Sequence, residues 1–156
     1  MPKLIVALDL PERKTIYQLV EQLDELIDYY KIGPVALTAC GFSLIDELLR
    51  RRKKIFLDLK FFDIPYVVGE TVHQLAELGI ELLTLHLLGG QRMVEAAIEG
   101  RNRSAGKLRL LGVTVLTSMT EDDWRTTGIE LDLKQLVQNL ACLGKDWGLD
   151  GVVCSP

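Results

Sequence analysis

Three charged residues stand close together at the end of an apolar stretch of this chain. Residues 54–65 read Lys-Ile-Phe-Leu-Asp-Leu-Lys-Phe-Phe-Asp-Ile-Pro, so Asp58 and Lys60 are two positions apart and Asp63 follows soon after. Side chains two residues apart in a strand point to the same face, which places a carboxylate beside an ammonium. Such a pair can be a structural ion pair, or it can belong to an active site, where ionisation is tuned by neighbouring charges.

The strand that must position this pair covers residues 54–59. Its alternation places Phe56 on the same face as Asp58 and Lys60, while the other face is aliphatic. Ile64-Pro65 end the extended segment, because proline has no N–H for a ladder and restricts the residue before it. In β/α folds the catalytic groups lie at the C-terminal ends of the strands, which is where both charges fall here.

Strand-like and helix-like segments alternate along the rest of the chain. The strands are expected at residues 4–8, 28–32, 54–59, 82–85, 108–116 and 151–154. Apolar residues at helical spacing predict helical segments at 16–27, 36–39, 44–52 with Ser43 as its cap, 67–78, 93–98 closed by Gly100, and 133–147. Thr120 and Asp123 form a capping-box pattern. This alternation predicts a single α/β domain over residues 1–156, with a parallel sheet covered by helices.

Composition narrows the classes of protein. The chain has 156 residues, of which 48% are hydrophobic and 26% are charged, and its net charge is −4. The basic run at residues 50–54 is interpreted as a solvated helix end, so no nucleic-acid partner is expected. No apolar run approaches the roughly 18 residues of a membrane span, and no signal peptide is expected, because no basic region followed by an apolar stretch opens the sequence. The cysteines lack metal-binding spacing, which predicts reduced, apolar residues in a cytoplasmic protein: Cys40, Cys142 and Cys154.

Polar side chains stand at or just after the ends of the expected strands: Asp9, Lys31, Asp58 with Lys60, His86 and Thr117. The beginnings of the strands carry nothing comparable. Because parallel strands end at one rim, these side chains are expected to form a ring around the C-terminal mouth of a barrel, where enzymes of that architecture work. The ring favours an active site over an isolated structural ion pair.

Several members of the ring have structural interpretations as well. Asp9 can cap the helix that follows it, and Thr117 and Ser118 can be ordinary loop hydroxyls. His86 is interpreted as a core histidine with satisfied hydrogen bonds. Lys31 has few such interpretations, since an unpaired ammonium is costly to bury.

The octapeptide Asp58-Leu59-Lys60-Phe61-Phe62-Asp63-Ile64-Pro65 resembles the D-x-K-x-x-D-I-P signature of the orotidine 5′-phosphate decarboxylase family. Three further segments look like that family at their strand ends: Leu8-Asp9, Lys31-Ile32-Gly33 and Val115-Leu116-Thr117-Ser118. The resemblance implies a (β/α)8 TIM barrel, of which this chain covers about the first six strands. A closed barrel of this type typically takes about 250 residues.

The resemblance implies a decarboxylase that makes UMP and carbon dioxide from orotidine monophosphate in pyrimidine biosynthesis, with no metal and no organic cofactor. By this analogy Lys60 donates a proton to C6 of the pyrimidine and Asp58 lies against the departing carboxylate. Lys31 holds a chain of alternating charges. Asp63 is expected to reach, with Ile64, across a two-fold interface into the partner's site, which makes the enzyme a homodimer.

The substrate contacts that the resemblance implies are Asp9 on the ribose hydroxyls, Thr117 near the pyrimidine, and further contacts from Lys31, Asp58, Ile64, Pro65 and Ser118. In the family, a glutamine and an arginine on the last strands grip the substrate phosphate, and they have no counterpart here. Remote binding energy lowers the chemical barrier, so these residues alone are expected to be a poor catalyst. We therefore expect a fragment of a barrel, with two open sheet edges and an uncovered apolar face.

Two alternatives stay open. Hexulose-phosphate synthase and ketogulonate-phosphate decarboxylase share the D-x-K-x-x-D core, but they typically carry a magnesium-site glutamate where Lys31 stands and lack Ile-Pro after the second aspartate. A truncated barrel that only dimerises or binds nucleotide is the other alternative.

Overall fold

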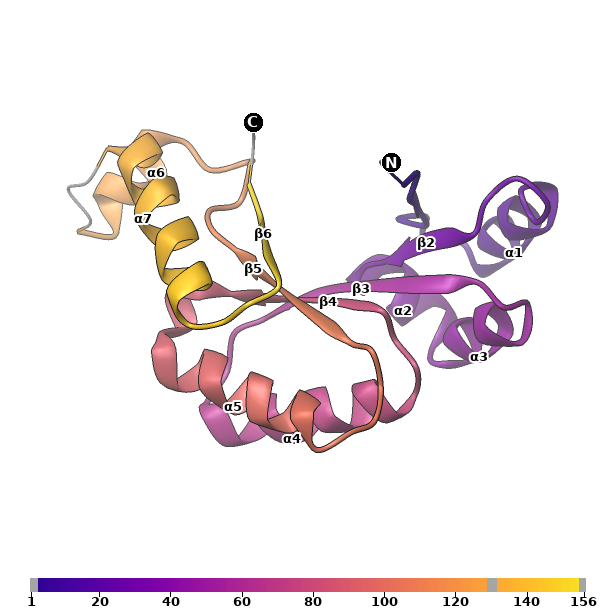
Figure 1. Ribbon diagram of the computed structural model, residues 1–156. Coiled ribbons are helices and arrows are strands. Elements are labelled where there is room, and N and C mark those ends of the chain that lie inside the picture. The colour runs from indigo at the N-terminus through magenta and orange to yellow at the C-terminus, as the bar shows by residue number, and fades with distance from the viewer. Residues whose placement is uncertain (1–2, 129–131, 155–156) are drawn as a thin grey trace.

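The computed structural model describes residues 3–128 and 132–154, and these residues form one parallel sheet covered by helices (Figure 1). The ends of the expected domain, 1–2 and 155–156, lie outside the described residues. The six strands of the described chain pair in sequence order: β1 (Val6–Ala7), β2 (Tyr29–Ile32), β3 (Lys54–Phe61), β4 (Leu82–His86), β5 (Arg109–Val113) and β6 (Gly151–Val153). All six predicted strands are therefore present, in the α/β arrangement that the alternation indicated.

Helices follow the strands and pack beside them. They are α1 (Arg13–Gln22), α2 (Pro34–Cys40), α3 (Ser43–Arg50), α4 (Pro65–Glu77), the 3-10 turn η1 (Leu87–Gly89), α5 (Gln91–Asn102), α6 (Glu121–Thr126) and α7 (Leu133–Asp146). In Figure 1, α4 and α5 run side by side below the middle of the sheet, α1 to α3 lie at the β2 end, and α7 lies beside β6. None of the helices of the described chain is both long enough and apolar enough to cross a membrane.

A close approach between α4 and α5 explains one error of the sequence interpretation. Gly100 was expected to end its helix, but α5 continues to Asn102. A Cβ atom on Gly100 would lie 2.1 Å from the carbonyl oxygen of Gly69 in α4. The glycine is therefore needed for close helix packing rather than for helix termination.

Two further expectations were wrong in detail. Ser43 lies inside α3 instead of capping it, and its hydroxyl donates to the carbonyl oxygen of Cys40 at 2.6 Å. The fifth strand ends at Val113, three residues earlier than expected, because its neighbour β6 ends at Val153, the residue that pairs with Val113. The capping box of Thr120 with α6 is confirmed.

Proline chemistry sets the start of α4 directly after the charged octapeptide. Pro65 occupies the first turn, where its missing N–H costs nothing, and Ile64 is extended as the N-cap. The helix thus begins two residues before the predicted start at Val67. The chain between Lys60 and α4 is consequently short, which holds Asp63 near the rim of the sheet.

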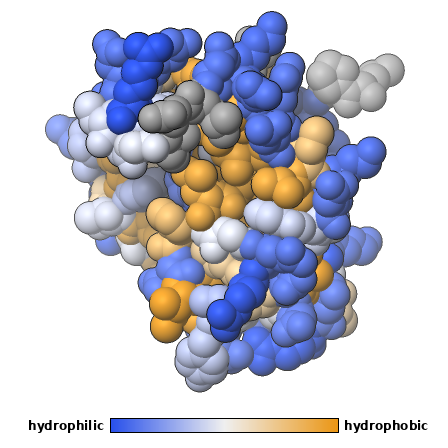
Figure 2. Space-filling view, turned by 90° about the vertical axis from the view of Figure 1, so that its left-hand side faces the viewer, coloured by the Kyte–Doolittle hydropathy of each residue, from blue (hydrophilic) through white to orange (hydrophobic). Residues whose placement is uncertain are grey.

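The sheet of the described chain is open. β1 and β6 each pair on one side only, and they form the two edges. Figure 2 shows apolar surface reaching solvent on the side that carries α6 and α7. Leu143 of α7 and Val152 of β6 are among the exposed large apolar residues. The open edges and the uncovered apolar surface agree with the expectation from the sequence.

The three cysteines of the chain differ in their exposure. All three are free, but only Cys40 is buried, while Cys142 and Cys154 are exposed. The expectation of reduced cysteines agrees with three free thiols, of which that of Cys40 is packed in the core.

Candidate active site

Four charged side chains form one connected network at the C-terminal ends of β1, β2 and β3. Nζ of Lys60 lies 2.9 Å from Oδ2 of Asp58, and Nζ of Lys31 lies 3.4 Å from the same oxygen. Lys31 also contacts Oδ2 of Asp9 at 2.7 Å. Signs alternate along the chain Asp9, Lys31, Asp58, Lys60, so each ammonium has a carboxylate and Asp58 has two ammoniums.

The strand register explains why these residues meet. Lys31 on β2 pairs with Phe56 on β3, and Asp58 is two residues further along the same face. Asp9 follows β1 and does not cap α1, whose N-cap is Glu12 without a side-chain bond. Gly33 makes room for it, because a Cβ atom there would lie 2.8 Å from Oδ1 of Asp9. The prediction that Asp9, Lys31, Asp58 and Lys60 lie together is confirmed.

The network fixes the ionisation of its buried members. Burial raises the pKa of Asp58, but hydrogen bonds from Lys60 and Thr84, and the charges of Lys60 and Lys31, outweigh it and hold this pKa below its usual value. Burial lowers the pKa of Lys31, and the bonds to Asp9 and Asp58 reverse that effect and raise it. Asp58 is therefore a carboxylate and Lys31 an ammonium at neutral pH.

Lys60 has an unusual backbone conformation. Its φ is +50°, in the left-handed region that costs an L residue roughly 1–2 kcal/mol. The ladder to β4 is irregular at the same place, since Leu57 pairs with Leu83 but Phe61 pairs with Leu85. Alternation correctly predicted that Lys60 lies beside Asp58, but not this bulge, which has no signature in the apolar pattern.

Thr84 is a site residue that the sequence interpretation missed. It is fully buried on β4, and its hydroxyl donates to Oδ1 of Asp58 at 2.9 Å while accepting from the backbone N–H of Lys60, also at 2.9 Å. The available signal was a single hydroxyl inside the run Leu82-Leu83-Thr84-Leu85. A polar side chain in an otherwise aliphatic strand needs a partner, and here the partners are the two charged residues of β3.

His86, at the end of β4, makes no hydrogen bond to the charged network among the described residues, but it senses the charge of Lys60. Its Nδ1 is buried and has no hydrogen-bond partner in the described part of the chain, so the expectation of a satisfied core histidine was wrong. Its ring lies 5.9 Å from that of Phe62. Burial and the positive charge of Lys60 both lower the pKa of His86, which keeps the imidazole neutral at pH 7.

The other predicted site residues lie on the surface, apart from Pro65 in the first turn of α4. Asp63 and Ile64 are exposed, and Oδ1 of Asp63 accepts from the N–H of Ile64 at 2.7 Å. Thr117 and Ser118 are exposed in the turn after β5. Within residues 3–128 and 132–154 none of these side chains bonds to the charged network.

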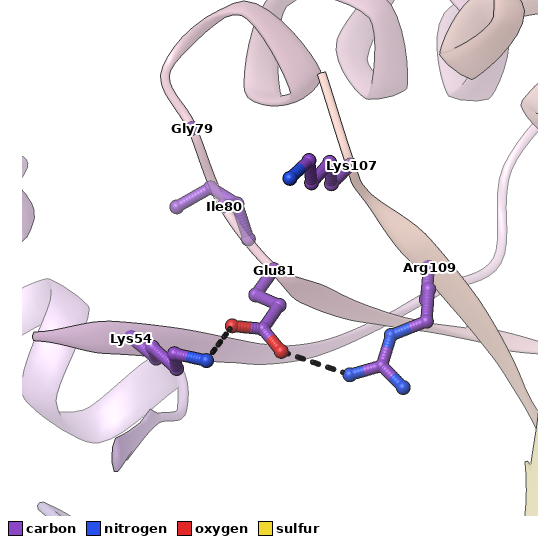
Figure 3. Close-up of a pocket in the computed structure, with 6 residues that line it drawn as sticks. All are labelled: Lys54, Gly79, Ile80, Glu81, Lys107 and Arg109. Atoms are coloured by element: carbon purple, nitrogen blue, oxygen red, sulfur yellow. Dashed lines mark hydrogen bonds and ion pairs between the residues drawn. The ribbon is translucent and has the colours of Figure 1, made fainter. Parts of the chain in front are cut away.

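A second ion-pair cluster lies at the opposite, N-terminal end of the sheet. There Glu81 contacts Lys54 at 3.4 Å and Arg109 at 3.0 Å around an open hollow that Lys107 also lines (Figure 3). Lys3 lies 3.8 Å from the same carboxylate. Burial and the nearby charge of Glu81 raise the pKa of Tyr29 to about 12, so its phenol stays neutral. This hollow is therefore lined by the carboxylate of Glu81, which already contacts several cations, and by exposed basic side chains. Its ion pairs are more exposed than the pair of Asp58 and Lys60.

Metal ligands do not gather in the described chain. Among its His, Cys, Asp and Glu residues, no group of three or more is arranged to hold a metal ion. At the position where a magnesium-site glutamate was considered, the structure has the doubly paired ammonium of Lys31.

Comparison with known proteins gives one consistent result. Residues 2–156 match the model of the Orotidine 5′-phosphate decarboxylase / HUMPS family. Orotidine 5′-phosphate decarboxylase from Nitrosospira multiformis is 43% identical over 99% of this chain and 64% of its own length. The enzyme of the same name from Legionella pneumophila (strain Paris) is 44% identical over 99% of this chain and 68% of its own length.

Solved structures agree with this result. Orotidine 5′-phosphate decarboxylase from Lactobacillus acidophilus matches with a TM-score of 0.88 and 38% identity, covering 100% of this chain and 72% of the other. An orotidine 5′-monophosphate decarboxylase from Methanocaldococcus jannaschii, complexed with inhibitor BMP, matches with a TM-score of 0.79 and 21% identity over 99% of this chain and 67% of the other, and it shows the shared fold alone. The chain spans about two thirds of the length of its curated relatives, between 64% and 68% in these two cases.

Proposed function

This chain belongs to the orotidine 5′-phosphate decarboxylase / HUMPS family, and on that premise we propose that it carries the catalytic charges of an orotidine 5′-phosphate decarboxylase. The reaction is a carbon–carbon lyase step that converts orotidine monophosphate to UMP and carbon dioxide. One observation carries the proposal: Nζ of Lys60 lies 2.9 Å from Oδ2 of Asp58 at the C-terminal end of the sheet. The name of the curated relatives supports the choice of reaction.

The proposed chemistry needs a fixed positive charge beside carbon. Decarboxylation breaks the bond between C6 of the pyrimidine and its carboxyl carbon, and the electron pair remains on C6 as carbon dioxide leaves. An ammonium held against C6 stabilises this developing charge and then transfers one proton to the carbon. Lys60 is the proposed donor, and its neutral amine regains a proton from water after product forms.

The neighbouring charges prepare Lys60 for this role. Asp58 stays ionised and contacts both Lys60 and Lys31, so the donor is a positioned ammonium before substrate arrives. The charged groups of the protein are already in place and do not have to reorient as charge develops on C6, which is the advantage of a preorganised site. In this proposal Asp58 lies against the departing carboxylate, and Asp9, on the outer end of the network, binds the ribose hydroxyls.

Substrate binding by the surface residues is proposed on the family resemblance. Ile64 and Pro65 flank the site after β3, and Thr117 and Ser118 lie in the turn after β5. Both segments follow the C-terminal ends of parallel strands, so they lie at the same end of the sheet as Lys60. We assign Thr117 to the pyrimidine and no metal or organic cofactor to the reaction.

This function is tested by an assay of orotidine monophosphate decarboxylation, in which the change in absorbance of the pyrimidine reports turnover. Because the chain spans about two thirds of its curated relatives, we expect slow turnover by these 156 residues. A fusion with the part of the Nitrosospira relative that the chain does not cover should react much faster, since remote phosphate contacts lower the barrier. Tight UMP binding without turnover in both proteins would contradict the enzymatic proposal and favour a nucleotide-binding barrel.

The same assay separates the sugar-phosphate alternative. A magnesium-dependent synthase or keto-sugar-phosphate decarboxylase would turn over its keto-sugar phosphate only with the metal and leave orotidine monophosphate unchanged. The paired ammonium of Lys31 speaks against that reading, because it occupies the place considered for a carboxylate ligand. The curated relatives carry the orotidine enzyme's name.

A homodimer that shares Asp63 is the second part of the proposal. Large apolar side chains are exposed on both sides of Asp63: Phe62, Ile64, Tyr66 and Val67. A cluster of this kind next to a charged site favours a protein interface. Asp63 makes no bond to Lys60 within its own described chain, which is consistent with its acting on the partner's site.

Hybrid dimers test this sharing. Lys60→Ala and Asp63→Ala chains are each expected to be inactive, and mixing them should restore part of the turnover because one of the two sites then has both residues. Two Lys60→Ala preparations mixed in the same way serve as the control. Absence of recovery in hybrids whose formation is verified would argue against Asp63 acting across the interface.

The reaction places the chain in pyrimidine biosynthesis, and we propose a cytoplasmic location. The three free cysteines support a reducing compartment.

A further inference from the structure

We infer that Thr84 is the positioning residue of this site: its hydroxyl sets the geometry of the Asp58 carboxylate and of the Lys60 backbone together. The inference deepens the proposed decarboxylase function and rests on it for its catalytic meaning. The contacts that carry it are independent of any substrate.

The three residues form a closed ring of hydrogen bonds across two strands. The Thr84 hydroxyl donates to Oδ1 of Asp58 and accepts from the N–H of Lys60, both at 2.9 Å. Nζ of Lys60 donates to the other carboxylate oxygen, Oδ2, at 2.9 Å. One side chain from β4 thus fixes both ends of the pair on β3.

The backbone of β3 explains why a side chain is needed at this point. The bulge between Leu57 and Phe61 takes the N–H of Lys60 out of the regular ladder to β4. Lys60 also has φ +50°, a conformation that L residues rarely adopt without specific support. Thr84 is 0% exposed, so water cannot replace the lost ladder partner.

The direction of each hydrogen bond is determined by chemistry. A backbone N–H can only donate, so the Thr84 oxygen must accept from Lys60, and its hydrogen is free to donate to Asp58. An ionised carboxylate can only accept, so the arrangement favours the charged form of Asp58. Thr84 therefore couples the backbone conformation that aims Lys60 to the charge that holds its ammonium.

Thr114 provides a matched control within the same fold. It is also fully buried and follows β5, but its hydroxyl donates to the backbone carbonyl of Val153 at 3.1 Å, with no hydrogen bond to a charged side chain among residues 3–128 and 132–154. Replacing either threonine by valine removes a buried hydroxyl at nearly constant shape. Only the change at Thr84 should reach Asp58 and Lys60.

The experiment uses NMR on the whole chain. It measures the pKa of the Asp58 carboxyl group, from the chemical shift of its carboxyl carbon, and the exchange rate of the Lys60 amide hydrogen. The charged and titratable groups that face Asp58 are Lys31 and Lys60, with Asp9 beyond Lys31 and His86 beside Lys60. They remain unchanged in all variants. Thr84→Val should raise the pKa of Asp58 and speed exchange of the Lys60 amide by on the order of tenfold, the value of one typical hydrogen bond.

Thr84→Ser should retain both properties, and Thr114→Val should leave both at the wild-type values. In the turnover assay Thr84→Val should lower kcat more than it changes KM, because the ribose and pyrimidine contacts assigned to Asp9 and Thr117 are untouched. An unchanged pKa and amide exchange in Thr84→Val would overturn the inference, and so would a serine variant that behaves like the valine one. These NMR results do not depend on turnover, so the inference can fail or hold separately from the decarboxylase proposal.

Discussion

The two ends of the sheet hold ion-pair clusters built from the same residue types, yet they are organised differently. At the N-terminal end Glu81 is surrounded by exposed cations, and the side chains of Lys54 and Arg109 are 48% and 49% exposed (Figure 3). At the C-terminal end the side chains of Asp58 and Lys60 are 12% and 34% exposed, and each is tied to a further buried or charged partner. Burial and the hydrogen bond from a buried hydroxyl, rather than charge alone, distinguish the pair of Asp58 and Lys60 from the surface pairs of Glu81.

Dielectric surroundings explain the difference in strength. Exposed ion pairs contribute about 0–1 kcal/mol because water and salt screen them. In a buried ion pair the attraction between the two charges is stronger because the local dielectric constant is lower, and burial of the charges carries a desolvation cost. In the cluster around Asp58 the favourable contacts outweigh the cost of burial and hold the Lys60 ammonium in place, whereas the cluster around Glu81 joins strand ends at the surface.

The largest expected effect is on turnover. Lys60→Ala should lower decarboxylation by about 10⁴-fold or more, since it removes both the proton donor and the charge that stabilises the carbanion. Lys54→Ala removes an ammonium from the other end of the same strand, and it should leave turnover unchanged. Absorbance assays on both variants, with circular dichroism to verify folding, check this contrast. Similar losses in the two variants would remove the distinction between the ends.

The next effect is on stability. Asp58→Asn leaves Lys31 and Lys60 facing each other without their shared carboxylate, and should cost about 1–3 kcal/mol of unfolding free energy. Glu81→Gln removes the shared carboxylate of exposed cations and should cost less than about 1 kcal/mol. Urea unfolding of the two variants under one set of conditions measures the difference. A larger loss in Glu81→Gln would contradict the ranking of the two clusters.

The residues of the C-terminal cluster could be predicted from the sequence, because their placement depends on the two-residue period of a strand and on the order of the strands. The period of two placed Lys60 beside Asp58, and the common rim of parallel strands brought Asp9 and Lys31 to them. The ends of the helices were harder to predict from the sequence. At Gly100, for example, a glycine is required because Gly69 of another helix approaches it closely. Local pattern alone does not contain that contact.

The parts that sequence reasoning missed are tertiary in origin. Thr84 belongs to a strand that pattern analysis reads as uniformly apolar, and its partners are 24 and 26 residues away. The left-handed conformation of Lys60 arises where β3 and β4 fall out of register. Neither can be predicted without knowing which residues face each other across the strands.

The smallest expected effect is the pH dependence of stability. The folded pKa of Asp58 is lowered, so its stabilising contribution is present above the unfolded pKa and is lost as pH falls through the folded value. The pKa of Lys31 is raised, so its contribution is present below the unfolded pKa and is lost as pH rises through the folded value. Urea unfolding across pH should show the difference between wild type and Asp58→Asn shrink at the acid end. A difference that stays constant into strong acid would mean that Asp58 is not held as a carboxylate.

The most direct test restores the ammonium chemically at residue 60. Lys60→Cys is made with Cys142→Ser and Cys154→Ser, which removes the exposed thiols, while burial raises the pKa of the remaining Cys40 thiol and protects it. Alkylation with 2-bromoethylamine then converts the new cysteine to an aminoethyl thioether with an ammonium near the original position. We expect the unmodified protein to lack decarboxylation and the alkylated one to regain a substantial part of it. Equal turnover before and after alkylation would contradict the claim that the ammonium of Lys60 protonates the substrate carbon.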